Sequence, residues 1–387
     1  MNKALVPQIR FKEFTYAWEL KRLGDFLDYE QPARYLVSSE DYNEKYKTPV
    51  LTAGKSFVLG YTNDNFGIFF ASTDSPVIIF DDFTTSSHFV DFPFKVKSSA
   101  LKILKKANKL HKDVFIFNIL KKIKYEVVNH ERHWLSIFSN IMVNFIDNIP
   151  EQNKIAQTFS TLDSLLTLHQ RKCEKLKKIK QTLLEKMFPV EGSNIPSIRF
   201  AGFTYAWELK RFGEILNKIT RKGYTELPQL TASKAGTMFI RSQINYSISV
   251  SATSLKSYVL VDKHDFVLHL STYDSGLAYS PFRGITSPAY SVLKFSEPLK
   301  SDPIFWKYVF NGKKFIKSLI PFTYGLRVGK TINLDELNES YLLTAQLPEQ
   351  NKIAQTFSTL DSLLTLHQRK CEKLKKIKQE LLNKMFV

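Results

Sequence analysis

The sequence predicts an α+β fold with two globular mixed domains, joined by a pair of long antiparallel helices that form a coiled coil with pseudo-twofold symmetry. Three observations lead to this expectation. One segment occurs twice, letter for letter, at Pro150–Gln181 and Pro348–Gln379. A shorter segment also occurs twice and precedes two different bodies of sequence. The length of 387 residues suits about two ordinary domains.

The shorter repeat is a lead-in to each body. Pro7-Gln8-Ile9-Arg10-Phe11 and the stretch from Phe14 to Arg22 return as Pro196–Phe200 and Phe203–Arg211. The bodies that follow, Asp28–Ile149 and Asn217–Leu347, share little beyond Pro-x-Leu-Thr-Ala-x-Lys at 49–55 and 228–234. Two similar frames around different bodies favour one scaffold that presents two specificities. The alternative is a recent duplication in which one body has drifted.

The repeats divide the chain into four predicted segments. Residues 1–149 form a first domain with its lead-in, and residues 150–190 form a central long helix. Residues 191–347 form a second domain with its lead-in, and residues 348–387 form a C-terminal long helix. Mixed strand and helix patterns within both bodies indicate the α+β class.

The exact repeat reads as a long amphipathic helix. No Gly or Pro occurs from Glu151 to Met187, and apolar residues recur at steps of three or four. Such a helix is about 55 Å long at 1.5 Å per residue. We expect the two copies to bury their seams against each other, whereas the alternative is that each helix packs on its own body. The predicted seam consists of Ile155, Phe159, Leu162, Leu166, Leu176, Leu183, Ile353, Phe357, Leu360, Leu364, Leu374 and Leu381.

The two cysteines, Cys173 and Cys371, occupy equivalent places in the repeat and follow His169 and His367 at a spacing of four. Near the symmetry axis of an antiparallel pair, these four residues could form a zinc site. The more conservative interpretation is ordinary seam packing, so no metal is predicted. Two cysteines exclude a disulfide framework and fit a reducing cytoplasm.

The charge predicts a polyanionic partner. Lys plus Arg is 55 against 37 acidic residues, which gives +18. The start of the chain lacks the apolar core of a signal peptide, and no apolar run is long enough to span a membrane. These features favour a cytoplasmic protein that binds nucleic acid rather than a membrane.

In the first body, Val77–Phe80 and Phe89–Phe92 read as strands, and Ser98-Ser99 reads as the cap of a helix through Leu101, Ile103, Leu104 and Leu110. Ten lysines and one acid lie between Lys95 and Lys124. This run indicates either a solvated face or a surface that contacts phosphates. In the second body, Phe305–Phe310 reads as a short helix and Phe266–Leu270 as a strand.

Candidate contacts to base edges or phosphates lie in polar, turn-rich stretches, because Arg, Lys, Asn, Ser, Thr and Tyr carry the donors and acceptors used on DNA. For the shared Pro-x-Leu-Thr-Ala-x-Lys pattern, a plain strand-to-turn role is the alternative. The candidates are Thr52, Lys55, Tyr61, Asn63, Thr85, Ser87, His88, Arg132, Thr231, Ser233, Lys234, Arg241, Arg283, Tyr324 and Arg327.

Several of these motifs are similar to those of a known family. Pro150–Ala156 and its copy at Pro348 resemble the "P-x-x-E-Q-x-x-I" helix start of type I restriction-modification specificity subunits, with the residues between Pro and Glu missing. Arg199-Phe200 through Trp207 to Gly213 resembles the lead-in of the family's target-recognition domains. Thr48–Gly54 and Ile78–Thr84 look typical of one recognition-domain type. The likeness extends over essentially the whole chain.

The resemblance implies that each body reads one half of a split, asymmetric site in double-stranded DNA, while the helix pair sets the spacing. It also implies two modification (methyltransferase) subunits that use S-adenosylmethionine, and restriction subunits that use ATP and Mg²⁺. This chain would bind no cofactor itself and would have no catalytic residue.

The residues agree that catalysis lies elsewhere, since the sequence contains no Asn/Asp-Pro-Pro-Tyr motif and no GxxxxGK[ST] loop. Glu19-Leu20-Lys21 and Glu208-Leu209-Lys210 have nuclease-like spacing but lack a Pro-Asp partner. The alternatives are a stand-alone DNA-modifying or DNA-cleaving enzyme with an unrecognised site, and a coiled-coil structural protein.

Overall fold

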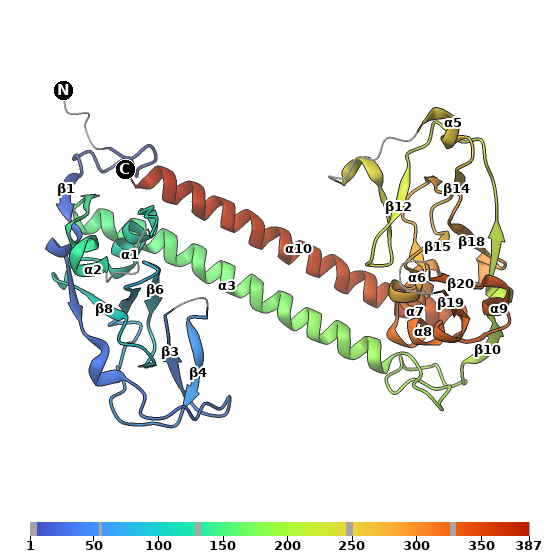
Figure 1. Ribbon diagram of the computed structural model, residues 1–387, viewed down its shortest axis with the longest axis horizontal. Coiled ribbons are helices and arrows are strands. Elements are labelled where there is room, and N and C mark those ends of the chain that lie inside the picture. The colour runs from blue at the N-terminus through green and yellow to red at the C-terminus, as the bar shows by residue number, and fades with distance from the viewer. Residues whose placement is uncertain (1–5, 54–55, 128–132, 245–250, 326–329, 387) are drawn as a thin grey trace. The chain divides into compact units, whose positions relative to one another are not determined.

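The computed structural model describes residues 6–53, 56–127, 133–244, 251–325 and 330–386. The chain divides into two compact units. Unit 1 comprises Met1–Arg171 with Gln368–Val387, and unit 2 comprises Lys172–His367. The long helices α3 (Ile149–Lys186) and α10 (Leu347–Met385) each contribute residues to both units (Figure 1). Over the described residues, no helix combines the length and apolar character that a membrane span requires.

The described residues of unit 1 form three antiparallel or mixed sheets. A four-stranded sheet has the order β2-β8-β5-β6, with every neighbouring pair antiparallel. Strand β1 pairs with β9, and the small sheet β4-β3-β7 contains one parallel pair. The strand bounds are β1 Glu19–Arg22, β2 Leu27–Glu30, β3 Thr48–Leu51, β4 Val58–Thr62, β5 Val77–Asp81, β6 Ser87–Val90, β7 Lys95–Val96, β8 Leu101–Lys106 and β9 Met142–Phe145. The helices are α1 Asp113–Lys122 and α2 His133–Ser136.

Unit 2 repeats this plan with different residues. Its four-stranded sheet has the order β11-β18-β15-β16, and β10 pairs with β21 as β1 pairs with β9. Smaller two-stranded sheets are β12-β13, β14-β17 and β19-β20. The strand bounds are β10 Glu208–Arg211, β11 Leu216–Ile219, β12 Leu230–Ala232, β13 Met238–Ile240, β14 Val259–Val261, β15 Phe266–Leu268, β16 Ala278–Tyr279, β17 Gly284–Thr286, β18 Ser291–Phe295, β19 Thr323–Tyr324, β20 Thr331–Ile332 and β21 Tyr341–Thr344. The helices are α4 Phe212–Ile215, α5 Ala252–Leu255, α6 Thr272–Ser275, α7 Pro303–Phe310, α8 Lys313–Ser318 and α9 Leu334–Asn338. Two bodies with little common sequence therefore share one sheet order, and the predicted α+β class is confirmed.

The predicted helix seam is buried within each unit. In unit 1, Ile155 and Phe159 of α3 share a core with Leu382 and Met385 of α10. In unit 2, Ile353, Phe357 and Leu360 of α10 share a core with Met187 and with Leu176, Leu183 and Leu184 of α3. Since the start of one helix meets the end of the other, the pairing is antiparallel in both units, as predicted. All twelve predicted seam residues are buried or half-buried.

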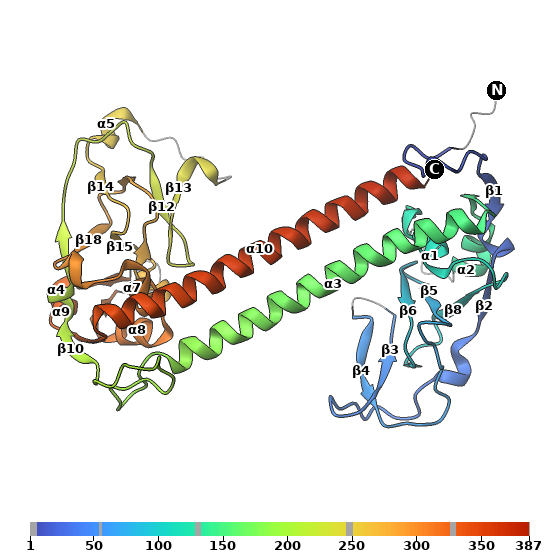
Figure 2. The ribbon, with the colours of Figure 1, turned by 180° about the vertical axis from the view of Figure 1, so that it is seen from behind.

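The alternative, that each helix packs on its own body, also holds in part. The core that contains Phe159 also contains Trp18, Phe115 and Phe145 of the first body. Views from front and back both show the end of α10 beside the start of α3 and beside α1 (Figures 1 and 2). Each helix end is therefore held by its partner helix and by the globular body at once.

The predicted helix through Leu101, Ile103 and Leu104 is wrong. These residues form strand β8, which is central in the sheet between β2 and β5. Leu101 and Ile103 face one core while Leu104 faces another, so both sides of the strand are apolar. This two-sided burial placed Leu101 and Leu104 three positions apart, a spacing that resembles a helical face. The Ser98 hydroxyl instead accepts a turn hydrogen bond from the Ala100 N–H at 3.1 Å.

The lysine run is not one solvated or phosphate-binding face. Lys95 and Lys102 are each 1 % exposed, and they form ion pairs with Asp64 at 2.6 Å and Asp82 at 3.3 Å. Two further lysines, Lys105 and Lys106, pair with Glu30 and Asp113. Part of the positive charge in this run is therefore neutralised inside the first body, and those four lysines have structural partners.

Candidate nucleic-acid interface

The repeated lead-in is locked to the repeated helix start by a buried ion pair. Arg10 donates from Nε and Nη2 to the two carboxylate oxygens of Glu151, both at 2.8 Å. The Glu151 side chain is 1 % exposed, so this charge depends on Arg10 for compensation. Next to it, Gln152 donates to the Ile146 carbonyl at 2.6 Å and accepts from the Lys112 N–H at 3.0 Å. The Pro-Glu-Gln motif thus ties helix α3 to the lead-in, to the end of β9 and to the start of α1.

Unit 2 contains the equivalent contacts, and in both units we call the Arg–Glu ion pair with the adjacent glutamine contacts the lock. Arg199 donates to Glu349 at 2.6 and 2.7 Å, and Gln350 contacts the Ala345 carbonyl and the Asp302 N–H. The hydrogen bonds to Glu349 raise the pKa of Arg199 above its ordinary value. This lock positions each body relative to the helix ends that belong to its own unit.

An aromatic box completes the frame in each unit. In unit 1, Phe386 packs on Trp18, Phe115 and Phe159, with ring centroids 5.7 to 5.9 Å apart. In unit 2, Phe188 packs on Trp207, Phe305 and Phe357 at 5.7 to 6.0 Å. Equivalent residues of the two repeats therefore make equivalent contacts. Neither the buried Arg–Glu pairs nor these aromatic contacts were predicted from the sequence. The Arg-Phe and Trp residues that both lead-ins share were a signal for them.

The unit 1 candidates lie on two neighbouring parts of the first body. Thr52 follows β3, Tyr61 lies in β4, and Asn63 is exposed directly after β4. His88 of β6 stacks on Phe57, which precedes β4, with the ring centroids 3.8 Å apart. Burial, together with the charge of Lys121, lowers the pKa of His88, so its imidazole is neutral near pH 7. The stack brings Phe57, directly before β4, beside His88.

The candidates Thr85 and Ser87 lie at the turn from β5 into β6. Thr85 has a positive φ of 58°, which is unusual for a β-branched residue. Ser87 is 5 % exposed and pairs with Phe80 in the sheet. Its hydroxyl is therefore far less accessible than those of the neighbouring turn. Lys55, Arg132 and Arg327 lie outside the described residues.

In unit 2, four candidates cluster at the β12–β13 hairpin. Thr231 pairs with Phe239 in the hairpin, and the Ser233 hydroxyl donates to the Thr237 carbonyl at 3.0 Å. Lys234 is exposed in the turn, and Arg241 donates to Gln229 at 3.2 Å directly after β13. The shared Pro-x-Leu-Thr-Ala pattern thus lies on a strand with an antiparallel neighbour in both units, β3 beside β4 and β12 beside β13. Tyr324 is apart from this group and donates to Glu336 at 2.7 Å.

The candidate Arg283 belongs to a cation cluster that sequence reasoning did not find. Asp262 receives Arg221 at 2.5 Å, Arg283 at 3.2 Å and Lys294 at 3.8 Å. The three cationic side chains are 40 to 58 % exposed, whereas that of Asp262 is 24 % exposed. Desolvation acts to raise the pKa of Asp262, but the hydrogen bond and charge of Arg221 outweigh it and hold the pKa low. One carboxylate therefore orients three cations at the surface, an arrangement suited to a phosphate.

A family model described as the type I restriction modification DNA specificity domain matches residues 16–178 and matches again at residues 205–376. The chain belongs to this family. The predicted kinship with type I specificity subunits is confirmed, and each match includes one body and most of the helix that follows it.

Relatives of the type I specificity family extend the likeness. The specificity subunit of the type I restriction enzyme EcoR124I/EcoR124II from Escherichia coli is 46 % identical over 141 residues, covering 35 % of this chain and 34 % of that protein. The chain therefore matches about a third of that relative's length. The type I restriction enzyme MjaVIII specificity subunit from Methanocaldococcus jannaschii is 21 % identical over 399 residues, covering 95 % of this chain and 91 % of that protein.

The fold also matches that of a solved family member. The crystal structure of a type I restriction-modification system S subunit from M. genitalium covers 99 % of this chain and 99 % of that chain, with a TM-score of 0.69 at 15 % identity. Among the residues that the structure describes, no group of three or more His, Cys, Asp or Glu side chains could hold a metal ion.

Proposed function

We propose that this chain is the non-catalytic, DNA-reading specificity subunit of a type I restriction-modification enzyme. The observation that carries this proposal is the double match to a DNA specificity domain, with each match falling on a body of the same sheet order. Each body, within residues 1–149 and 191–347, reads one half of a bipartite, asymmetric site in double-stranded DNA. The long helices within residues 150–190 and 348–387 set the spacing between the halves.

The electrostatics support a DNA partner. The chain carries +18, and the cluster around Asp262 presents three partly exposed cations. Contacts between such cations and phosphates release counterions and supply affinity without sequence preference. Sequence preference then comes from side chains that reach base edges. Tyr61, Asn63, His88, Thr231, Lys234 and Arg241 are our candidates for contacts in the two bodies.

The chemistry is assigned to other subunits. Two modification subunits dock on the helix frame and methylate adenine with S-adenosylmethionine, and restriction subunits supply ATP- and Mg²⁺-dependent cleavage. The complex works in the cytoplasm, where the host DNA lies. The family match favours this assignment over a stand-alone DNA-modifying or DNA-cleaving enzyme.

Selection from a pool of duplexes with a randomised segment tests the proposal. The purified chain, together with its modification subunit, is expected to enrich two short sequence blocks separated by a fixed unspecific gap. A substitution in one body should alter one block and leave the other unchanged. Enrichment of a single continuous block that responds to substitutions in both bodies would contradict the division of labour.

A further inference from the structure

Phe66 is the most exposed aromatic residue among those described. Its relative exposure is 90 %, and Phe70 on the same segment is 75 % exposed. Exposure of a whole phenyl ring is unfavourable in water, because apolar surface is stabilised by burial. Such a ring is therefore a candidate for contact with a partner molecule.

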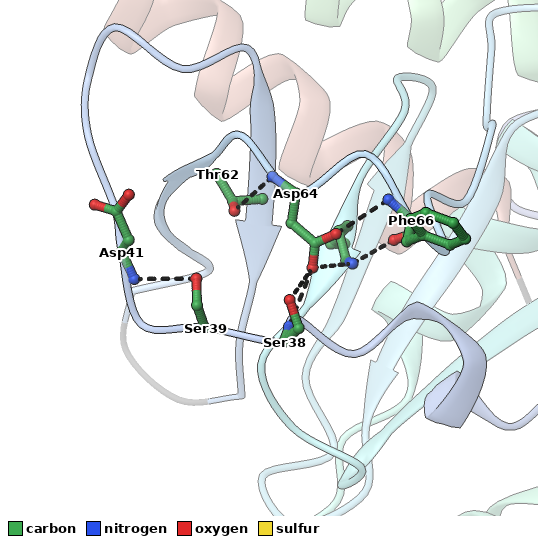
Figure 3. Close-up of polar contacts among 7 residues, drawn as sticks. Ser38, Ser39, Asp41, Thr62, Asp64 and Phe66 are labelled. Carbon is green, nitrogen blue, oxygen red and sulfur yellow. Dashed lines mark hydrogen bonds and ion pairs between the residues drawn. The ribbon is translucent and has the colours of Figure 1, made fainter.

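The backbone of Phe66 is held by hydrogen bonds to the ion pair of Asp64 and Lys95. Its N–H donates to Asp64 Oδ1 at 3.0 Å, and its carbonyl accepts from Lys95 Nζ. Lys95 also donates to Asp64 Oδ2 at 2.6 Å, and Ser38 adds hydrogen bonds of 3.1 Å from its N–H and 2.7 Å from its hydroxyl (Figure 3). The bond from Lys95, followed by those from Ser38, holds the pKa of Asp64 far below its usual range. Because Lys95 is 1 % exposed, this support belongs to the interior of the body.

The turn after Phe66 is fixed as well. Gly67 has φ of 59°, and a Cβ at this position would lie 2.3 Å from the Arg34 carbonyl oxygen. The Asp64 N–H donates to the Thr62 hydroxyl at 3.1 Å at the end of β4. The backbone on both sides of Phe66 is thus held in place while its ring is exposed to solvent. The ring therefore projects from a preorganised position.

The surroundings of the ring favour nucleic acid. Asn63 and Asn65 are exposed on the same turn, and an amide side chain can pair with adenine in a groove. The Arg34 carbonyl lies beside Gly67, and Lys105, which pairs with Glu30, lies 5.0 Å from the ring centroid of Phe69. Asp41 lies on the opposite side of the Asp64 cluster from Phe66 (Figure 3). Exposed amides beside the projecting rings of Phe66 and Phe70 fit the polar base edges of a nucleic acid better than an apolar protein face.

We infer that Phe66 is a specificity-determining contact of the first body, whose ring inserts against the stacked bases at one base step of the DNA half-site. This inference rests on the proposed function. Phenylalanine is one of the apolar side chains that proteins insert between base pairs, and such insertion favours steps that unstack easily. Asp64 and Lys95 are positioning residues, because they hold the backbone from which the ring projects.

The test compares variants of the full chain with its modification subunit on the randomised duplex pool. Phe66→Ala should weaken binding about tenfold, as expected for loss of one good base contact, and should erase the preference at one step of one block. Phe66→Met keeps an apolar wedge and should retain most of the preference. Leu299→Ala is the matched control, because Leu299 is also 90 % exposed but lies in unit 2.

A fluorescent base analogue reports insertion directly. When 2-aminopurine is placed at the affected step, its fluorescence should rise on binding of the natural chain, because its neighbours unstack, but not on binding of the Phe66→Ala variant. Unchanged selection and affinity for Phe66→Ala would overturn the inference while leaving the proposed function intact. Weaker association of the modification subunit with unchanged selection would instead make the ring a protein contact, which also overturns it. If the natural chain enriches no block, the proposed function and this inference both fall.

Discussion

Arg10 and Glu151 lie 141 positions apart in the chain and form a two-bonded ion pair whose carboxylate is almost completely buried. Arg199 and Glu349 repeat the pair in the other unit, at 2.6 and 2.7 Å. In both cases the arginine belongs to a lead-in and the glutamate to the first turn of a long helix. The pair therefore explains why the lead-in and the helix start occur as repeats around different bodies.

Removal of Arg199 should destabilise unit 2 strongly. Arg199→Met leaves Glu349 as a buried charge without its main partner, which costs about 3 kcal/mol or more. Hydrogen exchange of the amides in α7 and at the start of α10 measures this free energy of opening. Arg211→Met is the matched control, because its ion pair with Glu339 is exposed and screened by solvent, so its loss should change stability far less. Equal effects of the two substitutions would contradict the role of the lock.

Loss of cations around Asp262 should weaken DNA binding in a salt-dependent way. Arg221→Ala and Arg283→Ala are each expected to reduce the slope of log K against log salt by about 0.9, the value for one phosphate contact. The selected sequence blocks should stay the same. Asp262→Asn should act in the opposite direction and strengthen unspecific binding, because it removes a neutralising charge. Binding titrations at several salt concentrations measure the slopes, and an unchanged slope in both arginine variants would exclude the cluster from the interface.

The stability of unit 2 should depend on His269 below neutral pH. Burial lowers the pKa of His269 from 6.5 to about 4, so the folded state favours the neutral imidazole. The resulting stabilisation is present above pH 6.5 and is lost as the pH falls towards 4, with an upper magnitude of about 3 kcal/mol. The His269→Gln variant should therefore lose less stability than the natural chain between these pH values, as followed by hydrogen exchange of β15 amides.

Asp265 acts in the opposite sense and supplies the control for that experiment. Burial raises its pKa from 3.8 to about 6, so its stabilising, protonated form is gained as the pH falls through 6. An Asp265→Asn variant should therefore show a steeper loss of stability in acid. Identical pH profiles for the natural chain and the His269→Gln variant would contradict the assignment.

A fragment of residues 1–189 should form a homodimer. In unit 1, α3 is covered by Leu382, Met385 and Phe386, and the repeat places Leu184, Met187 and Phe188 at the equivalent positions at and directly after the end of α3. A second copy can therefore supply the missing contacts. Light scattering should give twice the fragment mass, and Phe188→Asp should shift it to monomer without unfolding it, since Phe188 is outside the unit 1 core. A natural fragment that stays monomeric would contradict self-complementary pairing.

The repeats and the helix seam were accessible from the sequence because both are local patterns. Every predicted seam residue from Ile155 to Leu381 is buried or half-buried, since a period of three to four places apolar side chains on one helix face. The β8 segment misled the same reasoning, because Leu101, Ile103 and Leu104 are divided between two cores. A strand that is buried on both faces has no distinctive period.

Contacts between distant segments were beyond sequence reasoning. No local pattern indicates that Lys95 donates a hydrogen bond to the Phe66 carbonyl. The same is true of the ion pairs that Asp262 forms with Arg221, Arg283 and Lys294. Such contacts form only when strands from separate stretches of the chain assemble. The shared sheet order of the two bodies was also hidden, since different buried residues satisfy the same packing. Sequence reasoning therefore identified the frame better than the surface that the frame presents.

Mapping of methylated adenines in host DNA by single-molecule sequencing tests the central claim most directly. Strains express this chain alone, a modification subunit alone, or both together. The account predicts methylation at a bipartite, asymmetric motif only when both are present. Methylation by this chain alone, or methylation by the modification subunit at the same motif without this chain, would contradict it.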